Sequence, residues 1–115
     1  MSTTPDLDMW IHGIKSREPL IFEAAFHGPR PTGPEVVPRL LAEMQRATDT
    51  YTRGKLIELL GGIGATDAVP KLVGELSHSD QDVRQWAVTA LRTIGGDVAI
   101  RAVEQYEREH HEEFV

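Results

Sequence analysis

The chain has 115 residues, 18 of them acidic and 12 of them Lys or Arg, so its formal net charge is −6 with neutral His. This length corresponds to one domain, and 40% hydrophobic residues at a mean hydropathy of −0.30 supply enough apolar material for a core. The absence of Cys excludes disulfides and Cys nucleophiles. The chain has neither a secretory signal nor an apolar run near the ~20 residues that a membrane span needs. We therefore expect a cytoplasmic protein with no membrane partner.

Residues 1–33 predict two short helices between proline-rich turns. Six of the seven prolines fall in the first 38 residues, and the segment 28–34 can only be a loop. Helical spacing predicts one helix at about 6–15 and a second at about 18–27. Their apolar residues are Leu7, Trp10, Ile11, Ile14, Leu20, Ile21, Phe22, Ala25 and Phe26. We expect Trp10, Phe22 and Phe26 to cover the end of a core rather than to form a ligand cage, because aromatic residues prefer burial.

From residue 34 onward the chain repeats itself. The segment 34–44 matches 66–76 at an offset of 32 residues, and 49–68 matches 80–99 at an offset of 31. Apolar residues in the matched segments follow the i, i+3, i+4, i+7 spacing of a helix face. Gly64 and Gly95 lie at positions expected for helix C-caps, and Asp80 and Asp97 lie at positions expected for N-caps. The repeated unit is therefore a pair of helices, with first helices at 49–63 and 80–94 and second helices over 36–44, 68–76 and 99–103.

The third unit carries a motif that resembles a known family. It contains Asp80-x-Asp82-Val83-Arg84 and then A-x-x-A-L-x-x-I-G, which ends at Gly95. This motif is similar to the HEAT-like repeat family, in the short form found in phycobilisome lyases and small bacterial proteins, and the resemblance covers residues 34–106. It implies an all-α fold, a short α-solenoid of about three antiparallel helix pairs, with the second helix of each pair on the inner side.

We expect a single domain made of an N-terminal helical cap (1–17), repeat 1 (18–47), repeat 2 (48–78) and repeat 3 with the acidic C-terminal end (79–115). A cap is needed because a stack of helix pairs ends in an apolar face. The resemblance also implies a structural ladder in which Asp49 pairs with Arg53 and Asp80 with Arg84. Such acid–base pairs four residues apart are ordinary support for a helix.

The sequence predicts no catalytic residue, no metal site and no cofactor, and hence no enzyme. Its five His residues follow no recognised metal spacing, and Glu107 with His111 near the terminus makes only a weak site. The single His111-Glu112 pair does not match the repeated His-Glu pairs of HEAT-type deoxyhypusine hydroxylases. An isoelectric point of 5.3 argues against nucleic acid, because phosphate binding requires a basic surface.

The candidate partner-binding residues lie on the second helices and at the C-terminal end. On the second helices the small residues Ala42 and Gly74, with Gln105, form a predicted trough that suits a partner's helix or loop. Two rows of residues flank this trough, Arg39 with Lys71 and Glu43 with Glu75 and Tyr106. Alternatively, Arg39 pairs with Glu43 and Lys71 with Glu75 along each helix. The C-terminal segment 104–115 is strongly acidic and forms either a solvated face or a rim for a basic partner, with candidates Glu104, Gln105, Tyr106, Glu107 and Arg108.

The expected function is that of a bacterial-type adaptor, a scaffold that binds another protein through the inner helical face and the acidic rim. Small acidic helical domains also resemble immunity proteins, which cover the active site of a toxin, and a basic nuclease toxin would suit the negative charge. The alternative is a cofactor-handling accessory, such as a lyase-like chromophore handler or a metal protein that uses the His110 region. Stoichiometric metal or pigment on the purified protein would identify that second class.

Overall fold

The computed structural model describes residues 5–114, which fold into α-helices and short 3₁₀ turns without a strand among them. The helices are α1 (Leu7–Ile14), α2 (Pro19–His27), α3 (Val36–Arg46), α4 (Thr50–Ile63), α5 (Val69–Glu75), α6 (Gln81–Ile94) and α7 (Asp97–Glu109), with 3₁₀ turns η1 (Thr66–Ala68) and η2 (His111–Phe114). The predicted all-α fold is confirmed.

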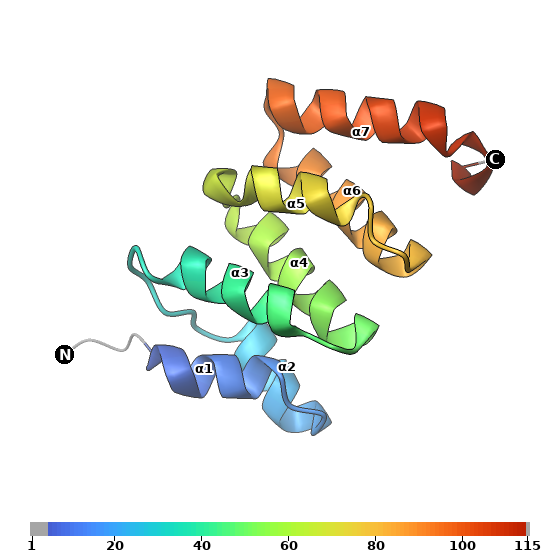
Figure 1. Cartoon of the computed structure of the whole chain (residues 1–115). Coiled ribbons are helices and arrows are strands. Elements are labelled where there is room, and N and C mark those ends of the chain that lie inside the picture. Colours follow the sequence, from blue (N-terminus) through green and yellow to red (C-terminus); the bar gives the residue numbers. More distant parts are fainter. Residues whose placement is uncertain (1–4, 115) are drawn as a thin grey trace.

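The helices stack in two layers, with α1, α3, α5 and α7 in one layer and α2, α4 and α6 in the other (Figure 1). The principal dimensions of 49 × 28 × 21 Å fit a stack that grows in one direction. The first described residues and the C-terminal end lie at opposite ends of this stack (Figure 1). The arrangement is the short α-solenoid that the sequence predicts.

Side chains and backbone at the helix ends explain where the helices start and stop. The carboxylate of Asp49 accepts a hydrogen bond from the Thr52 amide, and that of Asp80 accepts one from the Val83 amide, so both residues cap the first turn of a helix. Gly64 ends α4 with φ of 74°, a left-handed conformation that Gly adopts without strain. These local signals set the boundaries of α4 and the start of α6. The predicted N-cap Asp97 is instead the first residue of α7, whose N-cap is Gly96 without a side-chain hydrogen bond.

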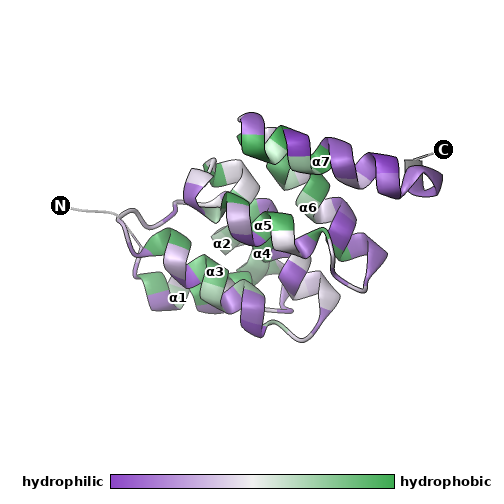
Figure 2. Ribbon diagram, turned by 45° about the horizontal axis from the view of Figure 1, so that its top comes forward, coloured by the Kyte–Doolittle hydropathy of each residue, from purple (hydrophilic) through white to green (hydrophobic). Residues whose placement is uncertain are grey.

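One continuous apolar core runs between the two layers. Its completely buried side chains include Leu40 on α3, Leu56 and Leu60 on α4, Leu72 on α5 and Leu91 on α6. Figure 2 shows the hydrophobic residues on the helix faces that meet other helices, whereas the C-terminal part of α7 is mainly hydrophilic. Each helix pair therefore buries its apolar stripe against its neighbours, as repeat architectures require.

The N-terminal pair α1–α2 packs through small residues and one aromatic anchor. The indole of Trp10 donates a hydrogen bond to the carbonyl of Ala25 at 3.0 Å. Trp10, Phe22 and Phe26 are buried, which confirms their expected burial. Leu20 and Ile21 depart from the apolar stripe predicted for this helix, because α2 turns them to the surface.

Candidate functional site

A buried pair of charges joins α4 to α5. The guanidinium of Arg53 donates from Nε and Nη2 to the two carboxylate oxygens of Glu75, at 2.5 and 2.9 Å. Both side chains are largely shielded from solvent. A two-point contact of this kind fixes the orientation of both groups and is stronger than a neutral hydrogen bond.

The next repeat places Arg84 in the corresponding position. Arg84 Nε donates to the Tyr106 hydroxyl at 3.0 Å, and Arg84 Nη2 donates to Glu113 at 2.8 Å. The Tyr106 hydroxyl donates to the second oxygen of Glu113 at 2.5 Å, and this hydrogen bond lowers the pKa of the Glu113 carboxyl. Glu113 therefore supplies the carboxylate that Glu75 supplies one repeat earlier.

Glu43 occupies the equivalent position on α3 and holds three cations. Its carboxylate accepts hydrogen bonds from Lys15 at 2.9 Å, Arg39 at 3.1 Å and Arg46 at 2.7 Å. Burial raises the pKa of Glu43, but the three cations together outweigh burial and bring it to about 2. Glu43 is thus an ionised structural carboxylate between α1 and α3.

These contacts correct the predicted exposed row of the inner face. Glu43, Glu75 and Tyr106 are only 5%, 8% and 4% exposed, so they are not part of an accessible surface. The positions recur because each one receives a cation from a neighbouring helix, which is a requirement of packing. The alternative pairing is found for Arg39 with Glu43, whereas Lys71 makes no ion pair with the described part of the chain.

The predicted pairing within the structural ladder is also wrong. Asp49 and Asp80 use their carboxylates to cap α4 and α6, and Asp49 forms its ion pair with Arg17 at 2.7 Å. Arg53 and Arg84 extend to the following helices instead of turning back along their own. All four residues make structural contacts, but the Arg53 and Arg84 side chains link successive helices, because Glu75 and the Tyr106–Glu113 pair accept their hydrogen bonds there.

The acidic rim is smaller than its composition suggests. Glu107 forms an ion pair with Arg92 on α6, and Glu113 is enclosed by Arg84 and Tyr106. The predicted residues Glu104, Gln105 and Arg108 are exposed on α7. Glu104 and Arg108 are four residues apart, so their charges offset each other along one ridge.

A hollow of about 200 Å³ lies between α5 and α7, in the layer formed by α1, α3, α5 and α7. Three apolar side chains with little or partial exposure, Val73, Leu76 and Ala102, form part of its wall. Exposed Gln105 and Glu109 lie at its edge. Of the predicted partner-binding residues, Gln105 and Tyr106 line this hollow, and sequence spacing gave no indication of its apolar part.

Carboxylates and helix C-termini place negative charge at the edge of this hollow. The C-terminal turns of α5 and α7 meet there, and helix C-termini carry partial negative charge. Glu109 lines the hollow and Glu112 follows three residues later; both are exposed and neither forms an ion pair with residues 5–113. The imidazole of His110, another lining residue, stacks on the ring of Tyr106 with centroids 4.2 Å apart. The site suits an apolar side chain next to a cation.

We also searched the described residues for metal-binding clusters and membrane-spanning helices. Within the described residues no three His, Cys, Asp or Glu side chains come together in a way that could hold a metal ion. None of the helices described is both long enough and apolar enough to cross a membrane. The cofactor-handling alternative stays a prediction.

A family model for HEAT repeats matches residues 37–115, well over half of the chain. The match begins in α3 and includes the α4–α5 and α6–α7 pairs. No curated protein matches the chain.

Proposed function

We propose that this chain, which belongs to the HEAT repeat family, is a non-enzymatic scaffold that binds another protein in the hollow between α5 and α7. The partner contributes one apolar side chain to the hollow and an adjoining Lys or Arg to its acidic edge. HEAT repeats commonly serve as protein-interaction scaffolds, and the inner helix layer offers the surface for such contact.

The observation that carries this proposal is the combination of an apolar wall with unpaired negative charge. Val73, Leu76 and Ala102 can bury an apolar group, while Glu109 at the edge forms no ion pair with the described residues. An apolar anchor gives affinity, and a complementary charge gives orientation and a faster encounter. The net charge of −6 acts in the same direction at longer range.

Internal ion pairs support a smaller binding surface than the two rows of residues expected from the sequence. Arg39 on α3 already pairs with Asp8 and Glu43, so the end of the inner layer near α3 is saturated by internal contacts. Lys71 and Gln105 remain exposed. We therefore place the partner over α5 and α7 and not across all three second helices.

A library of short peptides tests the proposal without a known partner. Each peptide presents Leu, Phe or Met next to Lys or Arg, and matched sets replace the basic residue by Glu or the apolar residue by Ser. We expect the native protein to retain only the apolar–basic set. Glu109→Lys should weaken retention of that set by about 5-fold or more at low salt, because one attractive contact becomes repulsive.

Glu104→Lys is the matched control, since Glu104 is an exposed residue of the same helix that does not line the hollow. It should change retention by much less than Glu109→Lys. Equal loss in both variants would assign binding to diffuse charge on α7. Retention that is independent of the apolar residue would refute a role for the hollow.

Inhibition of a basic toxin is a specific form of this function. The acidic surface supports it, because a positively charged active site would be steered to α7 and blocked there. A toxin gene next to the gene for this chain, a stable complex of the two products and loss of toxin activity in that complex are its expected signs. A complex that leaves the toxin fully active would contradict it.

A further inference from the structure

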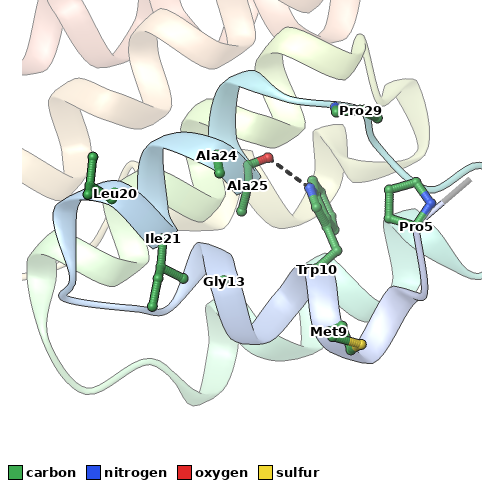
Figure 3. Close-up of a pocket in the computed structure, with 9 residues that line it drawn as sticks. All are labelled: Pro5, Met9, Trp10, Gly13, Leu20, Ile21, Ala24, Ala25 and Pro29. Atoms are coloured by element: carbon green, nitrogen blue, oxygen red, sulfur yellow. Dashed lines mark hydrogen bonds between the residues drawn. The ribbon is translucent and has the colours of Figure 1, made fainter.

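An apolar hollow lies at the other end of the stack, between α1 and α2. It has a volume of about 470 Å³ (Figure 3). Trp10, Gly13, Ala24 and Ala25 contribute its small or buried surfaces. Figure 3 shows Met9 on α1 and Leu20 and Ile21 on α2 beside it, and these three side chains are 76%, 87% and 50% exposed.

Exposed apolar side chains around one hollow indicate an interface, whereas scattered ones need no explanation. We propose that this end of the molecule is a self-association site, in which a second copy of the chain packs its α2 antiparallel to the first. Leu20 and Ile21 of each copy enter the hollow of the other.

The first argument is self-complementarity of shape. The same face of α2 carries two large exposed residues, Leu20 and Ile21, and one turn later two small ones, Ala24 and Ala25. A two-fold axis across the middle of α2 brings the large residues of one copy onto the small residues of the other. Every contact is then made twice, as in an isologous interface.

The second argument is charge. Glu18 precedes α2 and Arg30 follows it; both are exposed, and neither forms an ion pair with the described residues. The same two-fold axis brings the end of α2 that follows Glu18 in one copy to the end that precedes Arg30 in the other, and the reverse. The Arg30 guanidinium lies beside Gly62 of α4 and would turn from there to the partner copy. A parallel arrangement would instead place like charges together, which is unfavourable.

The third argument is the different character of the opposite end. Gly54 and Gly61 are the positions of α4 on which α6 packs. The repeat period of 31 residues makes Gln85 and Arg92 the corresponding positions of α6, where a following repeat would pack. Arg92 is paired with Glu107 of α7, so the outward side of α6 is polar. Head-to-tail stacking would place the apolar face of α2 against these polar groups of α6. The exposed large apolar side chains at that end, Val98 and Ile100, belong to α7, so the surface of α6 does not match that of α2.

Sedimentation equilibrium from about 1 to 500 µM tests the proposal, a range that suits the weak association of a small interface. We expect reversible dimers of the native chain. Leu20→Glu and Ile21→Glu should each weaken the dimer by about 100-fold or more, since every substitution removes two buried apolar contacts. Leu20 is so exposed that its replacement leaves the fold of the monomer intact, which circular dichroism checks.

Val98→Glu is the matched control, because Val98 is 68% exposed on α7 at the other end of the stack. It should leave the dimer unchanged. A monomer at every concentration would overturn the proposal, and so would a dimer that survives Leu20→Glu or is lost with Val98→Glu.

The absence of Cys from the chain allows a direct test of orientation. Chains with Glu18→Cys are mixed with chains with Arg30→Cys and treated with a short bismaleimide. The antiparallel arrangement predicts crosslinks mainly between the two different chains. Crosslinks that form mainly between identical chains would overturn it.

Discussion

The contact of α4 with α6 predicts opposite effects for the same substitution at two glycines. A Cβ atom built on Gly54 would lie 2.1 Å from Cε3 and 2.2 Å from Cζ3 of Trp86. A Cβ atom on Gly74 would meet nothing within 4 Å. Both residues are inside helices, so Gly54→Ala and Gly74→Ala differ mainly in the space available to the added methyl group.

The two free-energy terms can be estimated separately. Ala is favoured over Gly in a helix interior by about 0.5–1 kcal/mol. Gly74 is the next-to-last residue of α5, where the preference is weaker than in an interior, so the free energy of unfolding should rise by up to about 0.5 kcal/mol. At Gly54 the Trp86 ring must move by more than about 1 Å to restore normal contact, and overpacking of this kind costs about 1–3 kcal/mol. Because the clash is severe, we expect a net loss of about 1–2 kcal/mol for Gly54→Ala.

Thermal and urea unfolding followed by circular dichroism measure both changes. For a domain of this size, 1 kcal/mol corresponds to a change in Tm of about 4 °C. In a Trp86→Leu background the penalty at Gly54 should shrink or reverse, because the ring that causes it is gone. A Gly54→Ala variant as stable as Gly74→Ala, or a penalty unaffected by Trp86→Leu, would refute the close approach of the two helices.

Three further predictions concern the buried charges. Glu75→Ala leaves Arg53 unpaired and should lower the free energy of unfolding by about 3 kcal/mol. As a control, Glu58→Ala, which removes the more exposed 3.6 Å pair with Lys55, should cost less than about 1 kcal/mol. A double-mutant cycle that finds no coupling between Arg53 and Glu75 would contradict their ion pair. Because the folded-state pKa of Glu43 is about 2, below its ordinary 4.5, its contribution is present above pH 4.5 and lost as pH falls towards 2; urea titrations should show up to about 3 kcal/mol less acid destabilisation in Glu43→Gln. Tyr106→Phe removes one hydroxyl that bonds both Arg84 and Glu113 and should cost about 1–2 kcal/mol in urea unfolding, and an unchanged midpoint would show that the hydroxyl is dispensable.

The helices could be predicted from the sequence because their signals are local. Apolar spacing, capping Asp residues and terminal Gly residues all lie within a few positions of the helices that they define. The pairing of charges could not be predicted in the same way. The spacing of Asp49 and Arg53 permits an ion pair, but the carboxylate is used by a backbone amide and Arg53 bonds a residue 22 positions later.

A second signal for this pairing was present in the repeat itself. Arg84 bonds Tyr106, which is also 22 positions later, so the two contacts recur with the period of the chain. At this separation the sequence shows opposite charges only for Arg53 and Glu75, because position 106 is Tyr, so charge comparison indicates one of the two cross-helix contacts. No such signal exists for the hollow between α1 and α2, because Leu20 and Ile21 belong to a stretch that is apolar on several sides, and only packing decides which side is buried.

The last cross-helix contact also connects the fold with the proposed binding site. At the position of Glu43 and Glu75, the final repeat has Tyr106, which has no negative charge to offer Arg84, and Glu113 supplies it from η2. That contact holds the turn after α7 against the first turn of α6, and the same turn carries Glu112, close in sequence to Glu109 at the hollow. Arg84→Met should therefore release η2 and weaken binding of the apolar–basic peptides, although Arg84 does not line the hollow. Arg53→Met removes the equivalent contact with Glu75, far from η2, and should reduce stability with little effect on peptide retention. Equal losses of binding in both variants would show that η2 makes no contribution to peptide binding.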